Sequence, residues 1–308
     1  MLAALCLHLL DEQKQSWPQL AQAHLALSTV QTRSVSASGC QVFLQYNPQR
    51  AVSSGAAVDD ESISKRPCFL CTGNLPARQK AILYQNNYLI LCNPAPVFPE
   101  HFTIAHKRHL PQAIAASFSA LLDLTYDLAP EFAVFYNGPA CGASAPDHLH
   151  FQAAPRNLLP MIKDYPTQFR LVKETGGASF SIGKNLNCPV FMLEGGNKNI
   201  VQKQFSRLLK IIHQAAPGAA EPMINVICTY GKPVWRLIIF PRRRHRPDAY
   251  FREEGKRIFV SPGAIDLAGI IITPRLADFQ RLDAAQIAGI YQEVLLTGNT
   301  INKIIAEI

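Results

Sequence analysis

The alternation of apolar and polar residues along the chain predicts both helices and strands. Apolar residues recur at helical spacing from Leu5 to about Val30, and a polar, Ser-rich stretch without that period then leads to Cys40. The segment from Gln41 to Tyr46 alternates with a period of two, which predicts a strand. From Asn47 to Pro67 the chain carries Pro, Gly, Ser and acidic residues without periodicity, so we expect a long surface loop.

The following residues predict a unit that mixes strands with one helix. Its expected elements are a hairpin of Tyr88 to Cys92 with His101 to Ala105, a helix from Ser117 to Ala129, a strand from Phe132 to Tyr136, a loop from Asn137 to Asp147, and a strand from His148 to Ala153. The stretch between the hairpin strands is rich in turn residues. The unit therefore belongs to the α+β class.

A second set of elements loosely echoes the first, but without its histidines. It comprises an apolar strand near Cys188, a helix from about Lys198 to Gln214, and a strand pair at Met223 to Thr229 and Val234 to Pro241. We therefore expect an N-terminal helical segment over residues 1–40, a first α+β unit over 41–160 and a related second unit over 161–308, packed into one body.

Composition favours a globular protein that folds around a sizeable core. The chain has 308 residues, of which 48% are apolar and 17% charged, so disorder is excluded. Met1 to Leu10 is apolar but has no basic leader or cleavage pattern, and it predicts an amphipathic helix rather than a signal peptide. No transmembrane run occurs, and the scattered cysteines fit a reducing compartment. We therefore expect a soluble, cytoplasmic protein.

The net charge of +8 raises the question of a nucleic-acid partner. The basic residues do not form the long runs, interleaved with aromatic residues, that are typical of a strand-binding groove. Their one dense cluster is Arg242, Arg243, Arg244 and Arg246, which follows a predicted strand. Such a cluster suits a phosphorylated small molecule at least as well as a polymer, and it is also typical of a solvated surface.

Three polar residues share one face of a predicted strand. His148, His150 and Gln152 are two apart, so they point to the same side, while Leu149 and Phe151 point to the other. A lone histidine here would more often belong to the core, but two histidines and a glutamine in strict alternation indicate a functional site. The loop before them contains Gly138, Gly142 and Ser144, and small residues let backbone N–H groups approach a phosphate. The alternative is that this loop is an ordinary connection between two strands, because such connections are also rich in small residues.

Cys68 and Cys71 form a C-x-x-C pair. In a reducing compartment such a pair is usually half of a zinc site or a redox dithiol, and the flanking Pro67 and turn residues disfavour the dithiol. Zinc needs two more ligands, for which either His106 or His109, together with His148, is available. Two buried cysteines without a metal are the alternative.

At these positions the sequence resembles known nucleotidyltransferases of the histidine-triad superfamily. Cys68-Phe-Leu-Cys-Thr-Gly-Asn74 is similar to the zinc-binding C-F-L-C-A-G-N of galactose-1-phosphate uridylyltransferases, and the segment from Phe135 to Gln152 resembles their catalytic segment. His148-Leu-His-Phe-Gln-Ala153 and the stretch from Asn93 to Gln112 resemble GDP-hexose phosphorylases. The family is related to the ATP adenylyltransferases. The resemblance implies a histidine-triad-like antiparallel sheet with flanking helices.

The resemblance also implies roles for particular residues. His150 would be the nucleophile that takes a nucleoside monophosphate, with Gln152 on the phosphate oxygens. Asn137, Gly138 and Ser144 would form the phosphate loop, and Asn93 would replace an acidic residue on the ribose. Zinc would bind Cys68, Cys71, His109 and His148, and we expect His109 rather than His106 because Ala-His-Lys-Arg-His109-Leu resembles a zinc-bearing strand end.

The expected enzyme transfers a nucleotidyl group from a nucleoside diphosphate sugar or a dinucleoside polyphosphate. Its acceptor would be inorganic phosphate or a sugar phosphate, because an amide at position 152 can bond charged oxygens but supplies no proton. A nucleotide hydrolase of the same fold and a zinc-stapled nucleic-acid-binding module are the alternatives. Dimers are common for this fold, so a homodimer is expected, and no membrane partner is.

Overall fold

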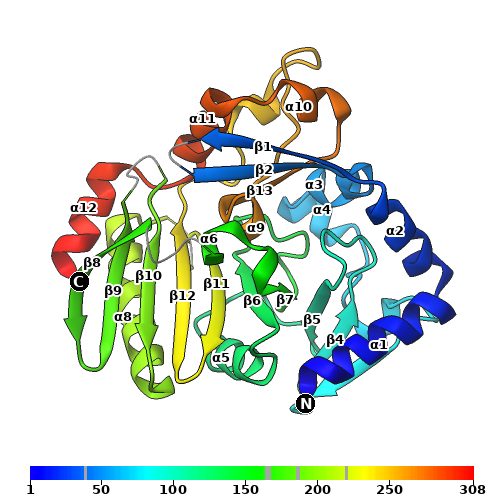
Figure 1. The fold of residues 1–308 in the computed structure, drawn as a ribbon, viewed down its shortest axis with the longest axis horizontal. Coiled ribbons are helices and arrows are strands. Elements are labelled where there is room, and N and C mark those ends of the chain that lie inside the picture. The colour runs from blue at the N-terminus through cyan, green and yellow to red at the C-terminus, as the bar shows by residue number, and fades with distance from the viewer. Residues whose placement is uncertain (38–39, 164–167, 185–187, 219–220) are drawn as a thin grey trace.

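A ten-stranded antiparallel sheet runs through the whole molecule in the computed structural model (Figure 1). The structure describes residues 1–37, 40–163, 168–184, 188–218 and 221–308. The strand order is β3-β4-β5-β7-β6-β11-β12-β10-β9-β8, and a smaller sheet of order β1-β2-β13 packs over it. The α+β class is confirmed.

The first half of the large sheet contains the strand that carries His150, and this strand begins at His150 rather than at the predicted His148. Its elements are β3 (Ala81–Tyr84), β4 (Tyr88–Cys92), β5 (Phe102–His106), α5 (Phe118–Asp127), β6 (Phe132–Asn137) and β7 (His150–Pro155). The expected hairpin is confirmed, because Tyr88 pairs with His106 and Cys92 with Phe102. β7 lies between β5 and β6 and pairs antiparallel with both.

The second half repeats the connection of the first. Its elements are β8 (Phe169–Thr175), β9 (Ala178–Gly183), β10 (Phe191–Gly195), α8 (Lys198–Ala215), β11 (Ile224–Gly231) and β12 (Val234–Pro241). Each half runs strand, strand, strand, helix, strand, strand, and in each half the fifth strand lies between the third and the fourth. β6 and β11 pair antiparallel where the halves meet, with Asn137 opposite Asn225.

The sheet is covered on both faces. On one face lie α1 (Leu2–Ser16), α5, α8 and α12 (Gly298–Glu307), which share an apolar core with it. A second core joins the other face to the small sheet and the C-terminal helices. These elements are β1 (Gln31–Ala37), β2 (Cys40–Tyr46), β13 (Ile270–Thr273), α9 (Ala264–Leu267), α10 (Leu276–Arg281) and α11 (Ala284–Val294). Of the described helices, none is long and apolar enough to cross a membrane.

Several expected elements differ from those observed. The N-terminal helix is two helices, α1 and α2 (Pro18–Ser28), because Trp17 is extended and Pro18 begins a new helix. The Ser-rich stretch is strand β1, whose residues are mostly exposed and so lack an apolar period. The expected loop from Asn47 to Pro67 contains the short helices α3 (Ala51–Ser54) and α4 (Asp60–Ser64), and α6 (Pro160–Lys163) follows β7. Strands β3, β8 and β9 were not predicted.

Candidate functional site

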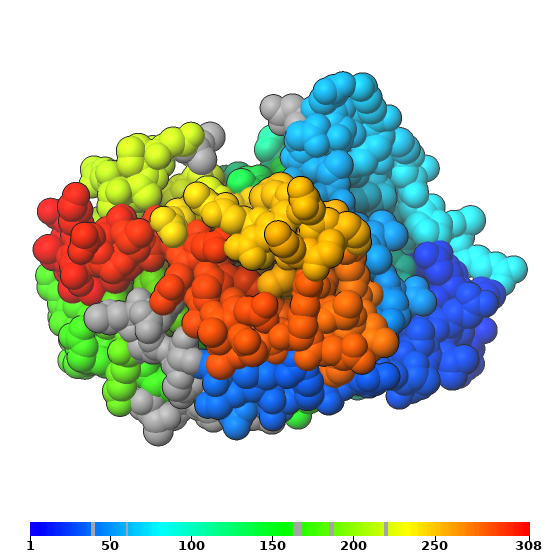
Figure 2. Space-filling model, turned by 90° about the horizontal axis from the view of Figure 1, so that it is seen from above, coloured from blue at the N-terminus to red at the C-terminus, as the bar shows by residue number. Residues whose placement is uncertain are grey.

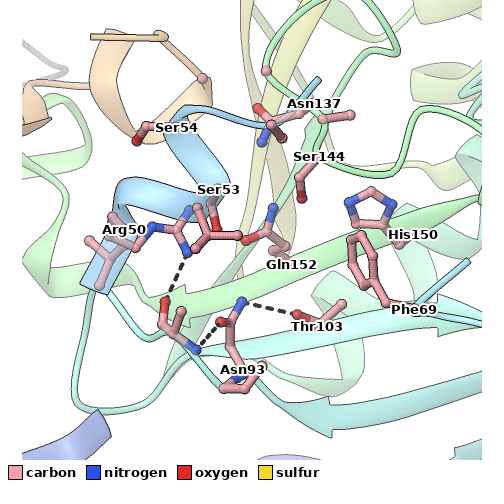
Figure 3. Close-up of a pocket in the computed structure, with 18 of the residues that line it drawn as sticks. Arg50, Ser53, Ser54, Phe69, Asn93, Thr103, Asn137, Ser144, His150 and Gln152 are labelled. Carbon is pink, nitrogen blue, oxygen red and sulfur yellow. Dashed lines mark hydrogen bonds between the residues drawn. The ribbon is translucent and has the colours of Figure 1, made fainter. Parts of the chain in front are cut away.

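A cavity of about 820 Å³ opens on the face of β7 that carries His150 and Gln152. Both residues line it, and so do Asn93, Asn137 and Ser144 (Figure 3). The structure thus brings together five of the residues that the sequence predicted as catalytic or substrate-binding. Gly138 belongs to the same loop but does not line the cavity.

His150 presents one ring nitrogen to this cavity. The ring is 4% exposed, and its Nδ1 lies 2.8 Å from the carbonyl oxygen of His148. A carbonyl only accepts, so Nδ1 carries the proton and Nε2 keeps its lone pair. Burial lowers the pKa of His150 to about 4, which keeps the ring neutral at neutral pH. The arrangement therefore provides a nucleophilic nitrogen without a separate base.

Gln152 is oriented by a histidine from the neighbouring strand. The backbone N–H of Val97 donates to Nδ1 of His101 at 3.2 Å, so the proton of that ring is on Nε2. His101 Nε2 then donates to Gln152 Oε1 at 2.9 Å. The amide NH₂ of Gln152 is consequently left to donate into the cavity. Burial lowers the pKa of His101 to about 3, so the ring stays neutral, with its proton on Nε2, over the physiological pH range.

A buried glutamine that the sequence argument did not assign joins the ends of β6 and β7. Gln112 is 2% exposed, and its Nε2 donates to the carbonyl oxygens of Asn137 at 2.9 Å and His150 at 3.0 Å. Its Oε1 accepts from the His150 N–H at 2.8 Å. One side chain thus replaces the sheet hydrogen bonds where the two strands separate around the loop. Gln112 fixes the strand end from which His150 projects.

Asn93 and the loop after β6 form other parts of the wall. Asn93 donates through Nδ2 to Thr103 Oγ1 at 3.1 Å and accepts from the Ala95 N–H at 3.0 Å, so both ends of its amide are already held within the protein. Gly142 has φ +92°, and a Cβ there would lie 3.0 Å from Gly263 Cα. Glycine is required because the backbone is left-handed and packs against a second segment. Ser144 lies beside His150 in Figure 3.

Four potential metal ligands lie together next to the cavity. The ligand atoms of Cys68, Cys71, His109 and His148 are all within 4.8 Å of one another. His148 Nδ1 is 3.3 Å from Cys68 Sγ, and His109 Nδ1 is 3.2 Å from Cys71 Sγ. Tetrahedral zinc with two sulfur and two nitrogen ligands separates them by about 3.3–3.8 Å, so these residues fit such an ion. The group could bind a metal.

The cluster selects His109 over His106. His106 Nδ1 accepts from the backbone N–H of Arg108 at 3.1 Å, and His106 is outside the cluster. Its carbonyl oxygen instead accepts from His148 Nε2 at 2.7 Å. That bond turns His148 Nδ1 toward the cysteines and is a typical support for a metal-ligating histidine.

Of the four arginines in the cluster, Arg246 lines the cavity and the other three do not. Arg242 is 2% exposed and donates mainly to backbone carbonyls, and Arg243 donates to the carbonyls of Glu293 and Gln292 near the end of α11. Arg244 pairs with Asp248. None of these three arginines lines the cavity, so the hypothesis that they hold the acceptor is wrong. Their side chains satisfy carbonyls and a local carboxylate.

Two cavity residues were missed by sequence reasoning. Arg50, at the end of the turn before α3, donates through Nη1 to the Ala95 carbonyl at 2.8 Å, while its buried Nε has no partner among the described residues. Phe69 is 46% exposed and lies against the cavity beside His150 (Figure 3). A lone arginine in an irregular stretch gives no sequence signal. Phe69, however, lies between the cysteines of a metal-binding loop, which positions any residue it contains.

A family model described as a domain of unknown function (DUF4922) matches residues 9–155. A search of curated sequences finds no match. The crystal structure of yeast Ap4A phosphorylase Apa2 superposes with a TM-score of 0.61 at 15% identity, covering 96% of this chain and 94% of that chain. The chain has the histidine-triad-type fold of that phosphorylase.

Two further structures of the same yeast enzyme show the same likeness. Its complex with Ap4A has a TM-score of 0.60 at 13% identity, covering 91% of this chain and 97% of that chain. Its complex with AMP has a TM-score of 0.58 at 14% identity and covers 94% of each. Within this histidine-triad-type fold only the first half carries the histidines, because β12, which corresponds to β7 in the repeat, reads Val-Trp-Arg-Leu-Ile-Ile-Phe-Pro. The part of the chain that the structure describes thus has one candidate site of this kind.

Proposed function

We propose that the protein is a nucleotidyltransferase that forms a covalent nucleotidyl intermediate on His150. The observation that carries this proposal is the fixed tautomer of that ring, with Nδ1 bonded to the His148 carbonyl and Nε2 directed into the cavity. A solvent-facing imidazole would have no such constraint, and a core histidine would bond at both nitrogens. A free, neutral Nε2 at the floor of a cavity is the arrangement required for attack on phosphorus.

The donors around the cavity favour an anionic substrate with an aromatic end. Arg50 lines the cavity and brings a positive charge to it, and none of the described residues accepts from its Nε. The NH₂ of Gln152 points into the same space. Phe69 offers an exposed ring on which a base can stack. A nucleotide with a polyphosphate or a sugar phosphate meets both demands, and yeast Apa2 has been crystallised with Ap4A and with AMP.

The proposed reaction has two in-line displacements. His150 Nε2 attacks the α-phosphorus with its lone pair, the bond from phosphorus to the bridging oxygen breaks, and the leaving phosphate takes that electron pair. An oxygen of the acceptor then attacks the same phosphorus, the N–P bond breaks, and the electron pair returns to Nε2. The NH₂ of Gln152 and the guanidinium of Arg50 would stabilise the charge on the phosphoryl oxygens.

We propose phosphate or a phosphorylated compound as the acceptor. The first displacement expels a weakly basic phosphate and the second returns a neutral imidazole, so neither needs a general acid, and an ionised phosphate can attack without a general base. Gln152 supplies no general acid, because an amide can donate a hydrogen bond but does not release its proton near neutral pH. Among the described lining residues the one carboxyl is Asp266, which accepts from the backbone N–H groups of Gly263 and Ile272. This disfavours a hydrolase of the same fold, which would need to activate water.

We further propose that the metal is zinc and that its role is structural. All four ligands are protein groups, which leaves no open position for a substrate. The ion would supply a fixed anchor for the loop that carries Phe69 and for the start of β7. The nucleic-acid-binding alternative loses its main support, because Arg242, Arg243 and Arg244 are engaged within the protein.

The deciding experiment is intact-protein mass spectrometry after incubation with Ap4A, ADP-glucose and GDP-sugars in the absence of phosphate. We expect the wild type to gain one nucleoside monophosphate from at least one donor, in a bond stable to alkali and labile to acid, and to release it when phosphate is added. His150→Ala should gain nothing, whereas His213→Ala, an exposed histidine of α8, should behave as the wild type. An adduct that persists in His150→Ala would overturn the proposal.

A further inference from the structure

The second half of the sheet contains a buried arginine with an unusual set of partners. The five N–H groups of Arg242 find five acceptors: the carbonyl oxygens of Val294, Pro262, Arg244 and His245, and Oδ1 of Asn225. Arg242 is 2% exposed, and no ion pair to it occurs among the described residues. A buried charge without a close counter-ion polarises the hydrogen bonds that it makes.

One of those bonds leads to the cavity through two amides. Arg242 Nη1 donates to Asn225 Oδ1 at 2.7 Å, and because a guanidinium only donates, this bond fixes which end of the Asn225 amide is oxygen. Asn225 Nδ2 then donates to Asn137 Oδ1 at 2.7 Å and to the Cys141 carbonyl at 2.6 Å. The Ala264 N–H donates to the same Asn137 oxygen at 2.8 Å. Each hydrogen bond in this series thus determines which end of the next amide is the oxygen and which is the NH₂.

These hydrogen bonds determine how the amide of Asn137 is oriented at the cavity wall. With Oδ1 of Asn137 accepting from two donors, its NH₂ group faces the cavity next to Ser144 (Figure 3). Gly263 leaves the room for this orientation, because a Cβ there would lie 3.2 Å from Asn137 Oδ1 and 3.4 Å from Nδ2. Asn225 is fully buried and is the register partner of Asn137 across the β6–β11 junction. The orientation is thus decided by the half that lacks the histidines.

We propose that Asn225 and Arg242 are positioning residues that hold Asn137 as a hydrogen-bond donor to the transferred phosphoryl group. The inference rests on the proposed function. Its physical basis is that a donor already aimed at the developing negative charge costs no reorganisation during the reaction. The chain of bonds from Arg242 also carries part of its positive polarity to the Asn137 NH₂. The second half-sheet therefore supports the phosphate site without touching the substrate.

The test is a double-mutant cycle between Asn225→Asp and Asn137→Ala. Asp has the size of Asn and accepts from Arg242, but it cannot donate to Asn137 Oδ1 and instead attracts the Asn137 NH₂. Only the Ala264 N–H then opposes a turn of the amide that would bring its oxygen to the cavity. We expect kcat/KM for the best nucleotide donor to fall about 100-fold in Asn225→Asp. In the Asn137→Ala background the same change should alter kcat/KM by less than about threefold, because the positioned group is already gone.

The controls separate positioning from loss of structure. Asn199→Asp, an exposed residue in the first turn of α8, should leave the kinetics unchanged, and all variants should keep the metal content and melting temperature near those of the wild type. If Asn225→Asp does not fold, Asn225→Ser removes the same donor with less charge. An equal loss in both backgrounds, or no loss in either, would overturn the inference.

A failure of the proposed function can be recognised separately. If the wild type forms no adduct with any donor, the same four proteins are titrated with AMP by calorimetry. Weaker AMP binding in Asn225→Asp that disappears in the Asn137→Ala background supports the positioning role even without transfer. Equal AMP affinity in wild type and Asn225→Asp refutes it.

Discussion

At the scale of single residues, the site is defined by which atom of each ring or amide carries hydrogen. His150, His101 and Gln152 all have two polar ends, and each becomes fixed because one neighbour can only accept or only donate. A carbonyl oxygen fixes the ring of His150, and a backbone N–H fixes the ring of His101. The His101 ring in turn fixes the amide of Gln152. The protein thereby presents a lone pair beside an N–H donor in the same cavity.

Replacing His101 tests this order of hydrogen bonds. In His101→Leu the Oε1 of Gln152 loses its donor, so the amide is free to rotate, and kcat should fall about tenfold, equivalent to one net hydrogen bond of roughly 1.5 kcal/mol. The KM for the nucleotide should change little, because the wall keeps its shape. Steady-state kinetics beside a His213→Leu control would measure this, and an unchanged kcat would contradict it.

The same variant should also change how the folding stability depends on pH below 7. The folded-state pKa of His101, about 3, lies below its unfolded value of 6.5, so the unfolded chain binds the additional proton first as pH falls. Stability that is present at pH 7 is lost on acidification, by about 3 kcal/mol at pH 4.5 from this residue. Denaturant unfolding at the two pH values should show a smaller loss for His101→Leu. A loss equal to that of the wild type would show that His101 is not buried as a neutral ring.

At the scale of elements, the metal cluster joins a loop to two strands. Cys68 and Cys71 lie on a short loop, His109 follows β5, and His148 precedes β7. The loop is tied from within as well, because Asn74 Nδ2 donates to the Cys68 carbonyl at 2.8 Å. A bound ion would therefore hold the start of β7 and the Phe69 ring in one rigid group.

Histidine variants around the cluster discriminate between ligand and neighbour. His109→Ala should lose the metal and lower the melting temperature by roughly 5–10 °C, because binding free energy of a structural ion is folding free energy. His106→Ala should keep the metal, because it contributes only its backbone carbonyl to His148. Elemental analysis and thermal unfolding measure both. Retention of one metal per chain in His109→Ala would refute the assignment.

At the scale of the whole molecule, the cavity is closed by segments from both ends of the chain. Arg246 donates through Nη2 to the carbonyl oxygens of Ser54 and Ala56 and through Nε to Ser261 Oγ at 2.9 Å. Its guanidinium also lies 4.3 Å from the centre of the Tyr250 ring. In Figure 2 the light-blue residues near position 55 accordingly lie beside the yellow residues that follow β12. One side chain clamps the two segments together.

Two arginines three positions apart provide a matched test of this clamp. Arg246→Met should free residues 51–57, raise the KM for the nucleotide donor about tenfold and make this segment more sensitive to limited proteolysis, since the segment loses the two hydrogen bonds at Ser54 and Ala56. Arg243→Met removes bonds to α11 instead and should leave KM unchanged. If both variants have the same KM and the same proteolytic pattern, the clamp does not shape the cavity.

Local sequence was sufficient where the function depends on neighbouring residues. The alternation of His150 and Gln152 required no knowledge of the fold to place both on the face that lines the cavity, and β12 was predicted with its observed bounds. The same alternation was wrong for His148, which lies before β7 and belongs to the cysteine cluster. The C-x-x-C spacing likewise identified two ligands of the cluster. Mostly exposed strands such as β1 and β8 were missed because their residues follow no apolar period.

The sequence by itself thus determined the α+β class, the pair of histidines and the pair of cysteines, because strand alternation and loop spacing are properties of a few consecutive residues. Only the tertiary structure decided between His106 and His109, turned Arg242 from an expected ligand of phosphate into a buried support, and placed Arg50 and His101 in the cavity. The polarity of Asn137 depends on Asn225, a residue 88 positions away. Such contacts follow from how the two halves of the sheet meet, and no local period records them.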